Sequence, residues 1–403
     1  MTIAKTQIES ALNRILISRF ISGIGDWGGL IAISNLSYSS THSVRSLSLL
    51  YATKISALLF SSVFQKIYYK KLPGSIPIGK LLAILDLISA ISLFCILKVN
   101  GINTAMLSSL YFLASVCTAI FFSITNSLIT EINPDFYKEN LRLVLLSKRA
   151  AFLIGPIIMG SIIGKWGNQY GILADALSFL ISGVVLFKIA TTTSDLASSQ
   201  ISDDEYHSGL FDTQMTKKQL ILPTALTVLV GLAGGAANAI ELPYIVTQLK
   251  LGSNFFGFSL ALGGLGAIIG ILLDGKISNK LDLSKLISTT MFCLVLSFLP
   301  WYLNSIFLFS FSLILFGISV TIFSNRILFH FVDAYNNSDS IRQYFKNKPS
   351  LFLFYHQVDS ISMILGSILA GIVADQYSTY ESIHFIVICL FIAAFTNFIF
   401  GNL

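Results

Sequence analysis

The stretch RILISRFISGIGDWGGLIAISNL, from Arg14 to Leu36, is apolar for the length of a membrane crossing and yet carries Arg19 and Asp26. A transmembrane helix needs about 20 mostly apolar residues. A charge inside such a helix is costly, so it usually faces the protein interior and marks a pathway or a partner. Arg19 and Asp26 are seven positions apart, which places them on nearly the same face of a helix. We therefore predict a transmembrane helix with one face towards a polar cavity.

The composition of the whole chain indicates a membrane protein. Hydrophobic residues make up 54% of the 403 positions and charged residues 11%, whereas a soluble domain has about 25% charged residues. The cysteines lie in apolar runs without the spacing of metal ligands, so we expect buried thiols rather than disulfides. No cleavable leader is expected, because the first apolar run is longer than the core of a signal peptide and no small-residue cleavage site follows it.

Twelve apolar runs predict twelve transmembrane helices, six on each side of a polar stretch. They cover approximately residues 14–36, 46–65, 78–97, 103–130, 143–164, 168–189, 219–247, 255–274, 286–303, 306–329, 351–374 and 380–401. The polar stretch from Thr191 to Lys218 is rich in Ser, Thr and Asp, which is typical of a flexible connector. The sequence thus predicts an all-α membrane protein with a six-helix half at 1–190, a cytoplasmic linker at 191–218 and a second six-helix half at 219–403.

The Lys and Arg residues indicate the orientation of these helices, because loops that stay in the cytoplasm are enriched in both. With the N-terminus inside, 20 of the 26 basic residues fall on the cytoplasmic side. Arg19 and Lys54 lie within spans, and the outer side keeps only Arg45, Lys98, Lys165 and Lys250. Both termini are therefore predicted to be cytoplasmic. The net charge of +6 then reflects membrane topology, and no nucleic-acid partner is needed to explain it.

Further polar residues within the apolar runs are candidates for proton or ligand chemistry. They are Asp86 in the third run, Asn238 and Glu241 in the seventh, and His356 and Asp359 in the eleventh. A carboxylate in an apolar cavity keeps a proton more readily than one in water, which suits a proton-coupled carrier. The same acids can instead pair with Arg19, Lys54 or Lys148 and hold helices together. His356 and Asp359 are three apart and share a helix face, where they would relay protons, bind a cation or form a structural hydrogen bond.

The seventh run also concentrates glycine and proline. Gly231, Gly234, Gly235 and Pro243 fall within one short stretch around Asn238 and Glu241. This density predicts either a bent or partly unwound helix whose freed carbonyls face a cavity, or simple close packing against a neighbouring helix.

The two predicted halves resemble each other in their glycine spacing. Gly155 and Gly160 in the fifth run are spaced like Gly366 and Gly371 in the eleventh. Two related six-helix halves are an arrangement used by secondary transporters, which bind substrate near the midplane.

Five segments carry a resemblance to a known family. They are RFISGIGDW (19–27), the Gly155-Pro156 pair, ADALSFLISG (174–183), LGGLGAIIG (262–270) and LGSILAGIVAD (365–375). With these segments the chain resembles the major facilitator superfamily, and within it the branch of macrolide efflux pumps and enterobactin-type siderophore exporters. The resemblance covers nearly all of the chain.

The resemblance implies a gate at the cytoplasmic end of the second span. The superfamily usually has the pattern G-x-x-x-D-R-x-x-R-R there, and its Asp pairs with a cation. Gln65 and Lys66 stand at the equivalent positions of this chain, so the Asp is missing. The second half retains Gly270, Asp274 and Lys276. We therefore expect the intact copy of the gate to be the one formed with Asp274 and Lys276.

The resemblance implies a secondary active transporter that exports an amphipathic small molecule, siderophore-like or drug-like, by alternating access with proton coupling. It implies a monomer that crosses the inner membrane many times, with protons or another ion as the coupling partner. The chain has no phosphate-binding G-x-x-x-x-G-K-[ST] and no H-E-x-x-H. Neither an enzyme, nor an ATP-driven pump, nor a cofactor is therefore expected.

Two alternatives remain open from the sequence. The first is a divalent-metal carrier similar to ferroportin-like members of the same superfamily. Its ligands would be Asp26, Glu241, His356 and Asp359, because carboxylate and imidazole groups suit first-row metals. The second is a sensor or scaffold, suggested by the degenerate loop around Gln65 and Lys66.

Overall fold

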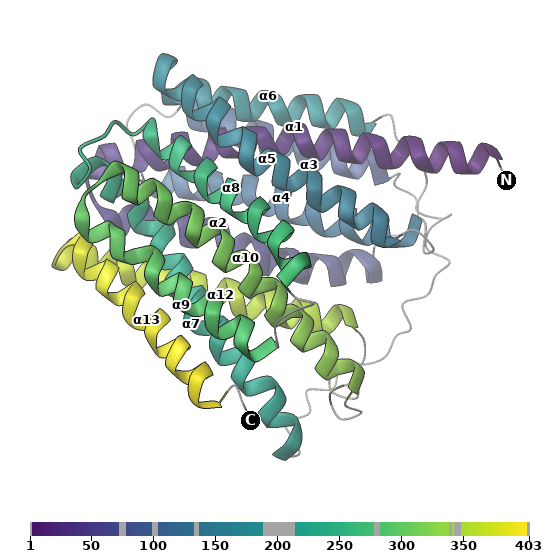
Figure 1. Cartoon of the computed structure of the whole chain (residues 1–403). Coiled ribbons are helices and arrows are strands. Elements are labelled where there is room, and N and C mark those ends of the chain that lie inside the picture. Colours follow the sequence, from purple (N-terminus) through teal and green to yellow (C-terminus); the bar gives the residue numbers. More distant parts are fainter. Residues whose placement is uncertain are drawn as a thin grey trace. The chain divides into compact units, whose positions relative to one another are not determined.

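The structure is a computed structural model and describes residues 2–71, 78–98, 104–132, 137–187, 214–277, 283–337, 341 and 348–400. The described residues form twelve α-helices and one short 3-10 helix, η3 (Leu299–Leu303), and they contain no strand (Figure 1). The helices are α1 (Thr2–Thr41), α2 (Val44–Lys71), α3 (Ile78–Lys98), α4 (Thr104–Ile132), α5 (Tyr137–Trp166), α6 (Asn168–Phe187), α7 (Gln214–Thr247), α8 (Phe255–Ile277), α9 (Leu283–Phe298), α10 (Ile306–Asn337), α12 (Lys348–Gln376) and α13 (Thr379–Phe400).

The prediction of an all-α membrane protein with twelve spans is confirmed. Nine helices in the described part of the chain are long and apolar enough to cross a membrane. Large apolar side chains are exposed along them, for example Phe307 and Phe398, as expected where lipid tails replace water around the protein. The ninth predicted run, 286–303, is divided in the structure between α9 and η3. Pro300 lies at the beginning of η3, where a proline cannot continue the hydrogen bonding of the preceding helix.

The chain divides into two compact units. The first comprises Met1–His42, Ser56–Asp203 and Ser253–Ala261. The second comprises Ser43–Ile55, Asp204–Gly252 and Leu262–Leu403. The beginning of α2 thus belongs to the second unit and the beginning of α8 to the first.

In the first unit, α1 and α6 run side by side in opposite directions (Figure 1). Two glycines of α1 make this approach possible. A Cβ atom on Gly25 would overlap the Ser178 side chain, and a Cβ atom on Gly29 would overlap the Asp175 carboxylate. Small residues at helix interfaces allow such close contact in lipid. An apolar core then joins α1, α3, α4 and α6, formed by Ile15, Leu82, Leu85, Cys117, Ile120, Phe121, Ile124 and Leu186.

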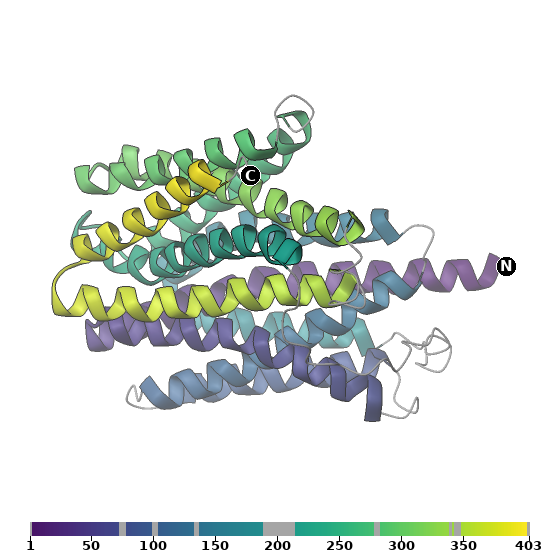
Figure 2. The same cartoon turned by 90° about the horizontal axis from the view of Figure 1, so that it is seen from below.

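In the second unit, α7 lies along α12, as the teal and yellow-green helices of Figure 2 show. The two helices run in the same direction and touch through backbone atoms. A Cβ atom on Gly235 would overlap the Met363 carbonyl oxygen, and one on Gly366 would overlap that of Leu232. The Ser367 hydroxyl donates a hydrogen bond of 2.8 Å to the Gly235 carbonyl. Gly231 and Gly235 of α7 therefore serve close packing against α12.

The expectation that α7 is partly unwound is wrong. The helix is continuous from Gln214 to Thr247, although Pro223 and Pro243 lie inside it. Thr227 and Thr247 each donate a hydrogen bond of 2.8 Å to the carbonyl of the proline four residues earlier. Membrane helices tolerate an internal proline because neighbouring groups and small local adjustments satisfy the backbone carbonyl that it frees.

Gly235 and its neighbour Gly234 provide a matched test of the α7–α12 contact. Gly235→Leu places a side chain against the α12 backbone, which cannot move aside locally, and we expect a loss of about 1–3 kcal/mol in stability. Gly234→Leu is the control, because among the described residues no atom lies within 4 Å of a Cβ atom placed there. Thermal unfolding in detergent, followed by circular dichroism, measures both variants. Equal melting temperatures for the two would contradict the packing described here.

Candidate functional site

A chain of hydrogen bonds lies buried in the first unit and ends on Asp86. The Ser182 hydroxyl donates to Asp86 Oδ2 at 2.5 Å. The Ser18 and Ser182 oxygens are also 2.5 Å apart. A serine hydroxyl has a single proton, so when Ser182 donates to Asp86, Ser18 donates to Ser182. The chain thereby links α1, α6 and α3, and Asp86 is only 2% exposed.

Arg19 lies next to this chain on α1 and is 4% exposed. Its guanidinium carbon is 5.6 Å from the centre of the Phe121 ring on α4, a geometry typical of a cation–π contact. A buried guanidinium is costly to desolvate and is retained where polar groups or rings compensate it. The prediction that Arg19 faces the protein interior is confirmed.

Asp26 is half-buried on α1, two turns beyond Arg19. Its carboxylate is within electrostatic range of Asp86 and of the Tyr111 hydroxyl. Asp175 on α6 also interacts electrostatically with Tyr111. The first unit therefore gathers three carboxylates and one guanidinium along α1.

Asp175 was missed by the sequence analysis, although it is only 2% exposed. The information was present, because Asp175 lies within the apolar run 168–189. The rule that marks Asp26 as a functional candidate, an acid inside a membrane helix, applies equally to Asp175. Its contact with Gly25 and Gly29 could not be read from the sequence, since it depends on how α1 and α6 are aligned.

The second unit separates the polar residues predicted for it. Glu241 is buried on α7 with Asn238 half-buried one turn before it. Asp359 of α12 lies at the level of Gly231, where a Cβ atom on that glycine would be 3.3 Å from Asp359 Oδ1. Gly231 and Glu241 are ten residues apart, or about 15 Å along the helix. Glu241 and Asp359 therefore do not share one site.

His356 and Asp26 are the other two metal-ligand candidates. His356 is exposed near the beginning of α12, and Asp26 belongs to the first unit. No group of three His, Cys, Asp or Glu side chains that could hold a metal ion occurs among the described residues.

Asp274, one of the two predicted gating residues of the second half, forms an ion pair with Arg326. Both Nε and a terminal nitrogen of Arg326 lie 2.6 Å from Asp274 Oδ1, and the same terminal nitrogen donates to the Asp274 carbonyl at 3.2 Å. Asn325 donates to the other carboxylate oxygen at 3.3 Å. Lys276 is exposed. Asp274 and Arg326 therefore join α8 to α10. Gln65 and Lys66 lie on α2, outside the residues whose side chains are described.

A second carboxylate missed by the sequence analysis lies at the end of α12. Asp375 accepts hydrogen bonds from the Ser43 hydroxyl at 2.5 Å and from the backbone amides of Val44 and Arg45 at 2.7 and 3.2 Å. These amides belong to the first turn of α2, where backbone donors lack partners in the helix and a negative charge is favoured. Asp375 thus caps α2 within the second unit.

Comparison with known proteins agrees with this architecture. Residues 15–340 match the model of the Major Facilitator Superfamily. The solved structure of the nucleoside transporter NupG has a TM-score of 0.75 at 14% identity, covering 97% of this chain and 98% of that one. A bacterial homologue of the iron transporter ferroportin, in an inward-facing state, has a TM-score of 0.71 at 13% identity, with coverage of 98% and 99%.

The POT family transporter PepTSo is similar to the same extent, with a TM-score of 0.73 at 9% identity and coverage of 97% of each chain. At these identities the structures establish the fold. The family match covers most of the chain and includes α1, α3, α6, α7, α8 and α10, which carry most of the polar residues described above. The chain is therefore a multi-pass membrane protein that belongs to the Major Facilitator Superfamily.

Proposed function

We propose that this protein exports an amphipathic small organic molecule, siderophore-like or drug-like, in exchange for protons. The observation that carries the proposal is the buried chain Ser18–Ser182–Asp86 with Asp26 in electrostatic range. A carboxylate in an apolar helix bundle can take up and release protons as its surroundings change. Hydroxyl groups hydrogen-bonded to it offer a path for the proton.

Two carboxylates are assigned to the coupling, the half-buried Asp26 in the first unit and the buried Glu241 in the second. The six-helix halves 1–190 and 219–403 would then alternate access to the substrate, with the linker 191–218 between them. The Asp274–Arg326 pair would hold the gate between α8 and α10 in one of the two states. The resemblance of five sequence segments, among them 19–27 and 262–270, to macrolide and enterobactin-type exporters is the reason for proposing an organic substrate.

A divalent metal is the weaker candidate for the substrate. The bacterial ferroportin homologue has the same fold, but Glu241 and Asp359 stand about 15 Å apart along α7 and α12. Metal–oxygen and metal–nitrogen bonds are about 2 Å long, so these two residues cannot bind one ion in this arrangement.

Calorimetry with the purified protein distinguishes the two substrates. We expect no saturable binding of iron, manganese or cobalt, and we expect His356→Ala to retain most of the transport activity. A metal held by imidazole and carboxylate would depend on each ligand and on pH, because protons compete for the same groups. Micromolar metal binding that is lost in His356→Ala or Asp359→Ala would contradict the proposal that the substrate is an organic molecule.

The proposal places both termini in the cytoplasm and the protein in the inner membrane. The basis is the asymmetry of Lys and Arg between the two sides. A cysteine introduced at Ser202, in the linker outside the described residues, should resist an impermeant maleimide added to intact cells. A cysteine at Ser253, just before α8, should react. The reverse pattern of labelling would invert the topology.

A further inference from the structure

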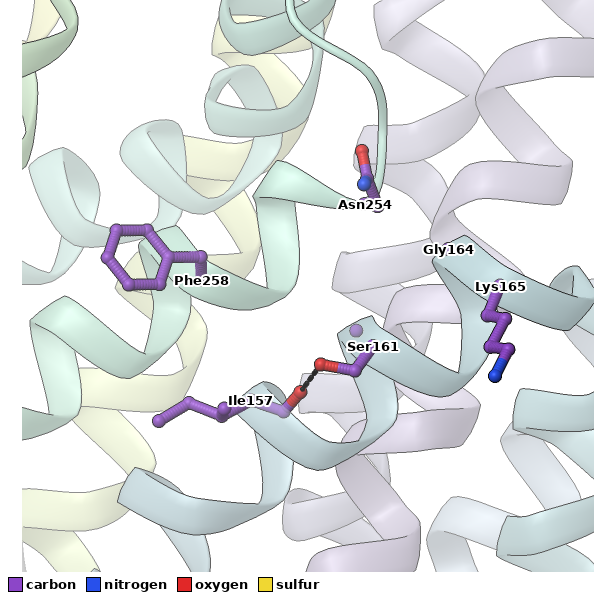
Figure 3. A pocket seen from close by; sticks show the side chains of 7 residues that line it. Ile157, Ser161, Gly164, Lys165, Asn254 and Phe258 are labelled. Carbon is purple, nitrogen blue, oxygen red and sulfur yellow. Dashed lines mark hydrogen bonds between the residues drawn. The ribbon is translucent and has the colours of Figure 1, made fainter.

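A groove of about 340 Å³ lies in the first unit between the last turns of α5 and the beginning of α8 (Figure 3). Ile157, Ser161 and Lys165 line it from α5, and Asn254 and Phe258 line it from the other side. Figure 3 shows Phe258 and Lys165 at opposite ends of the groove. None of these residues has a part in the proton chain described above.

Small residues on both sides create the hollow. A Cβ atom on Gly164 would lie 2.9 Å from the Asn254 Cβ atom, and one on Gly160 would lie 3.1 Å from the Gly257 Cα atom. The backbones of α5 and α8 therefore approach closely beneath the groove. Ser161 turns its hydroxyl back to the Ile157 carbonyl at 2.7 Å, so it projects little into the space.

The groove changes from polar to apolar along its length. Lys165 and Ile157 are eight residues apart, which is about 12 Å along the helix. Lys165 and Asn254 supply polar groups at one end, whereas Ile157 and Phe258 are exposed apolar side chains at the other. A molecule that matches the two ends of the groove has a polar head and an apolar tail such as an acyl chain.

Two exposed aromatic residues place the polar end of the groove at the membrane surface. Trp166 directly follows Lys165 and is 54% exposed, and Tyr170 lies in the first turn of α6 and is 44% exposed. Exposed Trp and Tyr side chains gather at the level of the lipid headgroups. The Lys165 ammonium lies 5.2 Å from the centre of the Trp166 ring. Ile157 and Phe258 then lie at the level of the acyl chains.

The charge at this end favours an anion. Lys165 makes no ion pair with a described residue, and the described lining of the groove contains no acid. A lysine ammonium binds a phosphate group through its point charge. We propose that the groove binds one anionic phospholipid, with its phosphate at Lys165 and Asn254 and an acyl chain against Ile157 and Phe258.

Native mass spectrometry of the purified full-length protein tests the site. The protein is stripped of lipid and incubated with an equimolar mixture of phosphatidylglycerol and phosphatidylcholine. We expect the wild type to retain one phosphatidylglycerol, with a preference of about fivefold over phosphatidylcholine, which corresponds to about 1 kcal/mol. Lys165→Gln should remove the preference, and Ser161→Trp, which fills the groove, should remove the retained lipid of either kind.

Lys98→Gln is the matched control, because Lys98 is also an exposed lysine in the last turn of a helix of the first unit but does not line the groove. It should keep the preference of the wild type. Both lysines are exposed, so neither substitution is expected to affect folding. The lipid site is overturned if the wild type shows no preference, if Lys165→Gln keeps it, or if Lys98→Gln loses it to the same extent.

Discussion

Arg326→Ala is expected to destabilise the protein by about 3–5 kcal/mol, because it leaves the Asp274 carboxylate buried without its guanidinium partner. The pair is well shielded, since the side chains of Arg326 and Asp274 are only 16% and 7% exposed. Two nitrogens of Arg326 converge on one carboxylate oxygen and a third contact reaches the backbone. Hydrogen bonds between charged groups are about twice as strong as neutral ones.

A double-mutant cycle measures the interaction itself. Asp274→Ala combined with Arg326→Ala should be less destabilised than the sum of the single variants, because no buried charge is left without a partner. Lys276→Ala is the control and should change stability by less than about 0.5 kcal/mol, as expected for an exposed side chain. Additive effects of the two single variants would contradict an interaction between Asp274 and Arg326. A larger loss in Lys276→Ala than in Arg326→Ala would indicate that Lys276 is the partner of Asp274.

Asp26→Asn and Glu241→Gln are expected to abolish transport that is driven by a proton gradient. Each substitution keeps the size of the side chain and removes its ability to exchange a proton. Binding of the substrate should survive in part, so exchange of labelled for unlabelled substrate across the membrane should continue without a gradient. Glu381→Gln, on an exposed carboxylate of α13, should retain both activities. If the pH dependence of transport were unchanged in both Asp26→Asn and Glu241→Gln, the assignment of proton coupling to these two residues would be contradicted.

The sequence predicts the fold well because the requirements of the membrane are local. A run of about 20 apolar residues is sufficient to identify a span, and the family match with its solved relatives confirms the twelve-helix arrangement. Ends of elements were less predictable. The ninth run is divided between α9 and η3, and the apolar character of the segment does not change where Pro300 interrupts the helix.

The site was predicted in part. Arg19 is buried as expected, since a charge in a lipid-crossing helix must turn inward. The partners of the charged residues could not be predicted, because each depends on the alignment of helices distant in sequence. Arg326 and Asp274 are separated by 52 positions, and Asp375 and Val44 by 331. No local pattern in the sequence specifies such pairs.

Glycine shows the same division between local and long-range information. Gly234 and Gly235 are neighbours in one helix, and the sequence alone predicts the same role for both. In the structure, Gly235 touches the α12 backbone while Gly234 faces open space among the described residues. Only the positions of the neighbouring helix distinguish a glycine required for packing from one that is not.

The central claim, proton-coupled export of an organic molecule, is tested most directly with the purified protein in liposomes that have an acidic interior. Protons leaving the liposomes should drive the probe inward, and the probes are enterobactin and a radiolabelled macrolide. We expect at least one of them to accumulate above its equilibrium level, and we expect accumulation to stop when the gradient is collapsed or when Asp26→Asn replaces the wild type. Gradient-driven uptake of manganese or iron that neither organic probe inhibits, with no accumulation of either probe, would contradict the claim.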